Sequence, residues 1–253
     1  MMATSLAVTR VLHACVLLEL PGGAVLTDPW FRPAWPTRLA ERPGLLPEQL
    51  PRLAAVLGGH GVPDHWQIEA LRPLADLPTT PILVATPSMA RKARRAGCTD
   101  VEVLRRGQRR ELGDDLAVTS VPGERITGMA TNGYVLESGG LAVYVGTEAR
   151  RLAPLRDVAH HHRVDVALLP VDGARLLGRR LVMDAATAVE ATLALGATTL
   201  VPIHHGQRPL RPLLTCRPGE LALAGLAAPP GLHVVAIPTG RRVTIAVPPR
   251  LRR

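Results

Sequence analysis

The sequence predicts a mixed α/β protein. Short apolar runs bounded by glycine, proline and aspartate alternate with segments of helical spacing along the whole chain. With 253 residues, 47% of them hydrophobic, the chain is long enough to bury a sizeable core. Aromatic residues make up only 2%, so leucine, valine and alanine must form most of that core. No linker or internal repeat interrupts the pattern, and we expect a single domain over residues 1–253.

The first half is expected to be rich in strands. Three short strands near residues 6–10, 15–20 and 24–28 are separated by Pro21-Gly22-Gly23 and closed by Asp28-Pro29. Residues 32–52, which are rich in proline and arginine, predict an extended loop. Helical spacing follows at residues 67–75 and 88–96, the second helix being capped by Ser88 and ended by Gly97. Further strands are predicted at residues 101–104, 116–121, 133–137 and 142–145.

The second half alternates helices and strands. A helix ending near His162 precedes a strand at residues 166–169, and a helix beginning at Asp184 precedes a strand at residues 199–203. A final pair of strands, residues 233–237 and 242–247, is expected to close the sheet.

Histidines and a carboxylate are concentrated in His60-Gly61-Val62-Pro63-Asp64-His65, just after the apolar run 53–57. A buried strand that delivers imidazoles and a carboxylate into one turn brings together the nitrogen and oxygen atoms that zinc and similar divalent metals bind. Taken alone, the hexapeptide fits solvent-facing loop histidines equally well.

Matches elsewhere in the chain support the metal-binding interpretation. The hexapeptide resembles the His-x-His-x-Asp-His loop of the metallo-β-lactamase fold superfamily, with Val62 at the second histidine. Residues 11–19 and 25–30 resemble the opening strands of that superfamily, with their Gly-His-Ala and Leu-Thr-Asp-Pro motifs. Residues 181–206, a helix leading into a strand that ends Pro-Ile-His, are similar to its ascorbate-6-phosphate lactonase-like branch. The resemblance spans roughly residues 5 to 210 and implies a four-layer αββα sandwich with ligands at strand ends along one edge.

The same resemblance implies an incomplete set of metal ligands. At the first metal position only His60 remains, because Val62 and the Gly123-Glu124 segment lack the family's histidines and Thr147 replaces its bridging aspartate. The second position keeps Asp64, His65 and His204. Three protein ligands with one open position are typical of a mononuclear catalytic centre that activates water. We expect one divalent ion, with zinc as the expected metal.

Two carboxylates beside the lost ligands leave alternatives open. Glu148 follows Thr147 and is one methylene longer than aspartate, and Glu124 adjoins the missing histidine. If both point inward, the carboxylate-rich set favours iron or manganese. Otherwise Glu124 pairs with Arg125 at the surface, and Glu148 begins the next helix.

Three residues are candidates for catalysis. The resemblance places His13 by the floor of the site, where it could donate to substrate, and Glu148 or Asp64 would accept a proton. Asp28 could orient a ligand imidazole by accepting its remaining N–H. Trp30, Phe31, Trp35 and Trp66 lie near these motifs in sequence and form either a pocket wall or ordinary core.

Charge and composition limit the partners. The net charge of +9 is carried by arginine, with Lys92 the only lysine, which suits a small anionic substrate. No aromatic residues interleave with the arginine runs, so we expect no nucleic-acid partner. The chain shows neither an apolar run long enough to span a bilayer nor a signal-type leader, so no membrane association and a cytoplasmic location are expected. The oligomeric state is left open.

Three functions are compatible with these features. The first is a metal-dependent hydrolase that acts on a small anionic ester, lactone or phosphoester through a metal-bound water. The second is a non-hydrolytic, redox metalloenzyme with a mixed histidine and carboxylate site. The third is a metal-free binding or scaffold protein that kept the fold.

Overall fold

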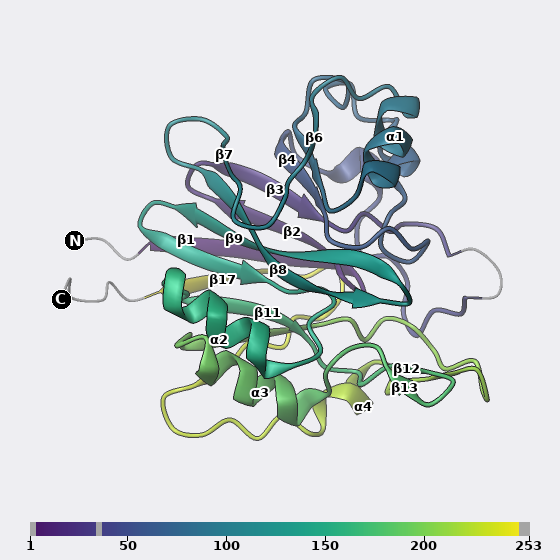
Figure 1. The fold of residues 1–253 in the computed structure, drawn as a ribbon, viewed down its shortest axis with the longest axis vertical. Coiled ribbons are helices and arrows are strands. Elements are labelled where there is room, and N and C mark those ends of the chain that lie inside the picture. Colours follow the sequence, from purple (N-terminus) through teal and green to yellow (C-terminus); the bar gives the residue numbers. More distant parts are fainter. Residues whose placement is uncertain (1–3, 34–36, 248–253) are drawn as a thin grey trace.

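Two β-sheets pack face to face and carry helices on their outer surfaces (Figure 1). The computed structural model describes residues 4–33 and 37–247. Helices α2 and α3 cover one sheet, and α1 lies against the other. This arrangement confirms the expected αββα sandwich.

The first sheet has seven strands in the order β17-β1-β2-β3-β4-β5-β6. Strands β3 to β6 run parallel to one another, whereas β17, β1, β2 and β3 pair antiparallel. The strands are β1 (Thr4–Leu12), β2 (Cys15–Leu20), β3 (Gly23–Thr27), β4 (Leu53–Gly58), β5 (Ile82–Val84), β6 (Val101–Val103) and β17 (Arg242–Val247).

The second sheet also has seven strands, in the order β16-β14-β11-β10-β9-β8-β7. Strands β10, β11, β14 and β16 are parallel, and β7 to β10 form antiparallel pairs. The strands are β7 (Arg109–Glu111), β8 (Ala117–Ile126), β9 (Met129–Ser138), β10 (Leu141–Val145), β11 (Val166–Pro170), β14 (Thr199–Ile203) and β16 (His233–Val234). A small third sheet joins β12 (Arg175–Leu176), β13 (Arg179–Arg180) and β15 (Leu214–Thr215).

The helices are short, and a side chain caps the start of two of them. Helix α1 (Pro87–Arg95) begins after Thr86, whose side chain accepts from Met89 N, and α3 (Ala185–Ala194) begins after Asp184, which accepts from Thr187 N. The others are α2 (Leu152–His161), α4 (Glu220–Leu223) and the 3-10 turns Pro47–Gln49 and Ile68–Leu71. None of the helices in the described ranges is long and apolar enough to cross a membrane.

Three expectations need correction. The helix predicted at residues 67–75 is a single 3-10 turn followed by further turns. Helix α1 is capped by Thr86 and not by Ser88, because Pro87 fits the first helical position. The last two strands do not close one sheet: β16 extends the second sheet beside β14, whereas β17 pairs with β1 in the first.

Three apolar layers hold the sandwich together. The central layer fills the space between the sheets with residues such as Leu6, Leu57, Leu136 and Val201. On one outer side, Met89 of α1 packs into a second cluster against the first sheet, and a third cluster lies under α2 and α3 on the other side. Strands β11 and β14 are buried along their full length, as parallel strands covered on both faces usually are.

Candidate metal centre

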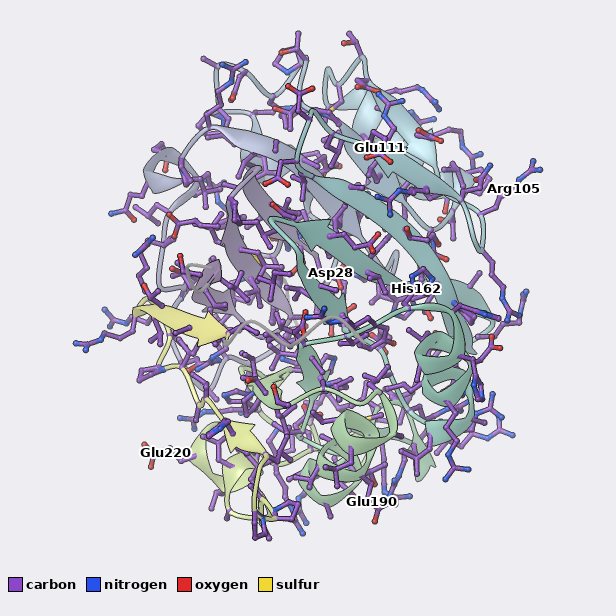
Figure 2. The ribbon with its side chains drawn as sticks, turned by 90° about the vertical axis from the view of Figure 1, so that its left-hand side faces the viewer. Asp28, Arg105, Glu111, His162, Glu190 and Glu220 are labelled. Carbon is purple, nitrogen blue, oxygen red and sulfur yellow. The ribbon has the colours of Figure 1, made fainter. Side chains whose placement is uncertain are left out.

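The candidate site forms where parallel strands of both sheets end. Asp28 follows β3, and His60 and His65 follow β4. From the second sheet Glu148 follows β10, Asp172 follows β11 and His204 follows β14. Carboxyl ends of parallel strands meet at one edge of a sheet, and the packing of the two sheets brings the two edges together. Asp28 is buried and is drawn near the middle of the side view, whereas the exposed Arg105, Glu190 and Glu220 lie at its edge (Figure 2).

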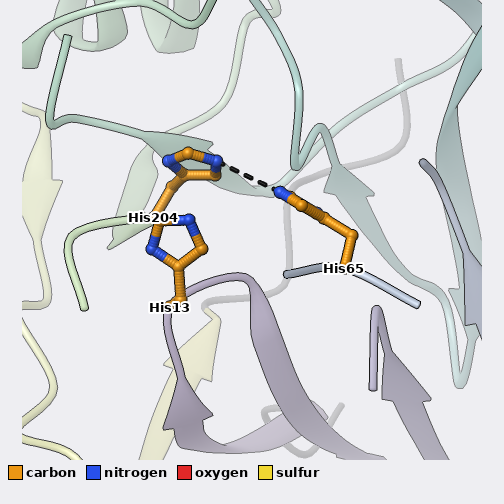
Figure 3. Close-up of side chains that lie close together, drawn as sticks. All are labelled: His13, His65 and His204. Carbon is orange, nitrogen blue, oxygen red and sulfur yellow. Dashed lines mark hydrogen bonds between the residues drawn. The ribbon is translucent and has the colours of Figure 1, made fainter. Parts of the chain in front are cut away.

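Two imidazoles face each other at the centre of this edge. His65 Nε2 lies 3.2 Å from His204 Nε2, the contact drawn as a dashed line in Figure 3. The other ring nitrogen of each points to a buried carboxylate: His65 Nδ1 lies 2.9 Å from Asp28 Oδ2, and His204 Nδ1 lies 3.3 Å from Asp172 Oδ1. A carboxylate accepts an N–H, so these contacts place a proton on each Nδ1 and leave each Nε2 as the atom that can bind either a proton or a metal ion.

Glu148 adds a carboxylate to the same point. Its Oε1 lies 3.0 Å from His65 Nε2, 2.9 Å from His60 Nδ1 and 4.0 Å from His204 Nε2. Burial alone would raise the pKa of Glu148, but His65 and His60 hold it well below its ordinary value. The carboxylate is therefore ionised although it is buried.

The negative charges around these atoms favour a bound cation. Burial opposes charge on His65, yet Glu148 and Asp28 raise its pKa well above the ordinary value, and Asp172 raises that of His204. The field at the two Nε2 atoms therefore attracts positive charge, which either a proton or a metal ion can supply. Glu148 Oε2 and His60 Nε2 are buried with no hydrogen-bond partner among the described residues. Two imidazoles and a carboxylate whose ligand atoms lie within 4.8 Å of one another could hold a divalent metal.

The geometry allows one such ion. Two sets of side chains in the described ranges are close enough to share a metal: His13, His65 and His204, and His60, His65 and Glu148. Both sets contain His65, whose Nδ1 is taken by Asp28, so only its Nε2 is free to bind. One lone pair binds one metal ion, and the two sets cannot be filled together.

His13 is set up as a donor. The N–H of Gly206 donates to His13 Nδ1 at 3.2 Å, which leaves the ring proton on Nε2. Burial lowers the pKa of His13 well below its ordinary value, and the neighbouring His204 and His65 lower it further, so the ring is neutral at pH 7. The rings of His13 and His204 contact each other with centroids 3.7 Å apart and a tilt of 45° (Figure 3), and Trp30 lies edge-on to His13 at 5.4 Å. A neutral imidazole with a proton on Nε2 donates a hydrogen bond and does not bind metal through that atom.

The backbone is strained at three of these residues. His13, Asp28 and His204 have φ values of 55°, 38° and 65°. Side chains other than glycine rarely adopt this left-handed region, and such strain gathers at functional sites because the surrounding structure must hold it. Here the main chain is held by His204 N donating to His13 O and Gly59 N donating to Asp28 Oδ1.

Two candidate ligands lie outside the cluster. Asp64 is half-buried and belongs to neither set of metal-binding side chains. The backbone N–H groups of His65 and Trp66 both donate to Val62 O, which forms a turn that carries the His65 ring into the cluster and leaves Asp64 outside it. Of the two candidate carboxylates, Glu148 and not Asp64 lies close enough to His60 and His65 to share a metal ion with them.

Glu124 is also not placed as a ligand. Its Oε2 accepts from Arg150 at 2.7 Å and from Arg151 at 2.7 Å, and its Oε1 accepts from Arg151 N. The carboxylate is buried, but two guanidinium groups occupy it. The expected surface pair with Arg125 is not formed either, since Arg125 donates to Gly128 O.

The aromatic residues near these motifs do not all have the same contacts. Trp30, Phe31 and Trp66 all pack in the outer apolar layer with α1, and Trp30 also contacts the ring of His13, as a pocket wall would. Trp35 lies outside the described residues.

Asp28 and Asp172 support the two facing imidazoles. The contact between Asp28 and a ligand imidazole is confirmed. Sequence reasoning missed Asp172, although it follows the buried strand β11 by two residues. A carboxylate just beyond the carboxyl end of a buried parallel strand is the signal that could have identified it.

Comparison with known proteins agrees with this fold. A family model described as the beta-lactamase superfamily domain matches residues 7–204. The chain belongs to this metallo-β-lactamase superfamily and has its metal-dependent hydrolase-like fold.

Relatives cover most of the chain. An uncharacterized protein of Mycobacterium tuberculosis is 29% identical, over 98% of this chain and 71% of its own length. A UPF0173 metal-dependent hydrolase of Methanosphaerula palustris is 28% identical, over 78% of this chain and 82% of its own length. The solved structure of Igni18, a metallo hydrolase from Ignicoccus hospitalis, has a TM-score of 0.70 at 19% identity and covers 97% of this chain and 100% of that one.

Proposed function

We propose that this protein hydrolyses a small anionic ester, lactone or phosphoester at a single divalent metal ion. The observation that carries the proposal is the pair of facing lone pairs on His65 Nε2 and His204 Nε2, each ring held by its own buried carboxylate and both close to Glu148 Oε1. The metal-dependent hydrolase related to this chain supports the same chemistry. The strand that ends Pro202-Ile203-His204 supports a place in the ascorbate-6-phosphate lactonase-like branch.

The ligands we propose are His65, His204, Glu148 and His60. A divalent ion bound there supplies a Lewis acid and lowers the pKa of water, which provides a nucleophile at neutral pH. Asp28 and Asp172 keep the two imidazoles in the tautomer that offers Nε2. Glu148 keeps its negative charge in the buried site and can accept a proton from an attacking water through Oε2.

His13 has a separate role in this proposal. Its Nε2–H is buried with no partner among the described residues and lies beside the His204 ring. A fixed donor of this kind stabilises negative charge that develops on a substrate oxygen.

The donor set also supports a second candidate. His60, His65 and Glu148 form the two-histidine, one-carboxylate combination that non-haem iron enzymes use. The identity of the bound metal separates the two functions: zinc supports hydrolysis, and iron supports a redox reaction. With histidine nitrogens in the majority, we propose zinc.

Hydrolysis of a substrate panel tests the proposal. The zinc-loaded protein is assayed with 4-nitrophenyl phosphate, bis(4-nitrophenyl) phosphate, 4-nitrophenyl hemisuccinate and an acyl homoserine lactone. We expect turnover of at least one anionic member, lost in His204→Ala and kept in His160→Ala, which removes an exposed histidine of α2. Equal turnover by the His204 variant would show that the reaction does not use this site.

A further inference from the structure

A second feature of the molecule, a cavity of about 650 Å³, opens between two β-hairpins. One wall is the turn between β8 and β9, and the other is the hairpin of β12 and β13, which Figure 1 shows near the same end of the fold. The residues that line it are Arg125, Ile126, Thr127, Gly128, Arg150, Leu176, Leu177, Arg179, Arg180 and Leu181. The lining is thus made almost entirely of arginine and aliphatic side chains.

Both hairpin tips have an unusual backbone. Thr127 and Leu177 each have a φ of 49°, and each is followed by a glycine with positive φ. Two successive residues with positive φ form the tight turn that matches the twist of a hairpin, but asparagine or aspartate normally takes the first position. Leu177 accepts this strain and is 70% exposed. Core packing does not explain an exposed leucine there, whereas contact with an apolar ligand does.

The four arginines are only partly neutralised. Arg150 pairs with Glu124, and Arg180 pairs with Asp184 at 3.0 Å. Neither Arg125 nor Arg179 forms a salt bridge with any described residue. Two guanidinium groups therefore remain to bind an anion, and their planar forks suit a phosphate or carboxylate.

The cavity lies next to the metal centre. Arg150 follows Glu148 by two residues, so their Cα atoms are at most about 7.6 Å apart. Glu124, the partner of Arg150, lines a small cavity together with Glu148. On the other wall, Met183 N donates to Ala149 O, which ties the segment after β13 to the residue that follows Glu148. Residues that line the cavity are therefore only a few positions along the chain from Glu148, and a molecule held in the cavity lies near the proposed metal ligands.

We propose that this cavity binds the anionic, apolar-substituted part of the substrate. Arg125 and Arg179 bind a phosphate or carboxylate group, and Leu176, Leu177 and Leu181 contact an attached alkyl or aryl chain. This assignment rests on the proposed hydrolase function for its catalytic meaning, but the binding itself does not need the metal. The assignment narrows the proposed substrate class to amphiphilic anions, in which a phosphate or carboxylate group carries an alkyl or aryl chain.

Calorimetric titration of the His204→Ala variant tests the binding without a metal ion that could hold the anion. The probes are hexyl phosphate, inorganic phosphate and hexanol. We expect hexyl phosphate to bind best, and the added changes Arg125→Ala and Arg179→Ala to weaken it at least about tenfold. Arg91→Ala, which removes an exposed arginine of α1, should leave it unchanged. Leu177→Ser should weaken hexyl phosphate but not inorganic phosphate.

Two results would overturn the assignment. If hexanol binds as tightly as hexyl phosphate, the arginines do not contribute to binding. If the double arginine variant binds hexyl phosphate as tightly as its parent, the phosphate binds somewhere other than Arg125 and Arg179. Failure of the hydrolase proposal gives a different pattern: the wild-type chain would lack metal and activity, yet the arginine variants would still lose hexyl phosphate binding.

Discussion

At the residue scale, buried carboxylates determine which ring nitrogen of His65 and of His204 is available to a metal ion. Asp28 and Asp172 direct the Nε2 lone pairs of His65 and His204 toward each other, whereas the N–H of Gly206 directs the Nε2 proton of His13 outward as a donor. Identical side chains therefore take different roles because of the group at the opposite ring nitrogen.

Asp172 tests this control directly. Asp172→Asn keeps the size of the side chain but no longer accepts the His204 N–H as strongly, so metal affinity should fall about 10- to 100-fold. Competition with a zinc-binding dye measures the change. Asp114→Asn, an exposed substitution, serves as the control. Equal metal affinity in the two variants would show that Asp172 does not support metal binding by His204.

Substitution of His13 distinguishes hydrogen-bond donation to the substrate from metal binding. His13→Ala should leave metal content unchanged and reduce kcat about 100-fold, because a fixed donor to the substrate is lost. Metal analysis and steady-state kinetics on the same preparation check both halves. Loss of the metal in this variant would instead make His13 a ligand.

At the element scale, the ends of parallel strands and the caps of helices position the site. Helix α3 precedes β14, which carries His204, and begins at Asp184, whose carboxylate accepts from Thr187 N and Thr187 Oγ1. Asp184 also pairs with Arg180 on the cavity wall. The cap thus joins the helix, the hairpin and the strand that ends in a ligand.

Removing this cap should have a measurable cost. Asp184→Ala should lower the free energy of unfolding by about 1 kcal/mol at pH 7. Burial tends to raise the pKa of Asp184, but the Thr187 hydrogen bonds and Arg180 lower it below its ordinary value. A lowered folded-state pKa gives stability above the unfolded-state pKa that is lost as the pH falls through the folded-state value. Urea unfolding should therefore show a smaller difference at pH 3 than at pH 7, and an equal difference would contradict this account.

At the scale of the whole molecule, the family resemblance predicts the sandwich and names all four proposed ligands, with Glu148 left open between a ligand and the start of a helix. His60, His65 and His204 follow buried strands whose apolar patterns are local, so a single sequence reveals them. The choice between Asp64 and Glu148 depends on contacts of His60 and His65 with a residue more than 80 positions away, and the role of Asp172 depends on its contact with His204, 32 positions away. The β12–β13 hairpin was missed because Leu177-Gly178 is not a usual turn pair.

Metal binding should stabilise the whole fold, because the ligands come from both sheets. A ligand that binds only the folded state adds about 2.7 kcal/mol at a concentration 100 times its Kd. Thermal unfolding with zinc should therefore show a higher Tm than the same protein after chelation. His204→Ala should show no such difference, and a metal-dependent Tm in that variant would indicate a site elsewhere.

The central claim is that one divalent ion sits between His65 and His204, and elemental analysis of protein purified without chelators tests it most directly. We expect about one equivalent of metal per chain, because both candidate sets need the same lone pair of His65. We expect none in His204→Ala and one in His160→Ala. Two equivalents in the wild-type chain, or an undiminished content in His204→Ala, would contradict the account.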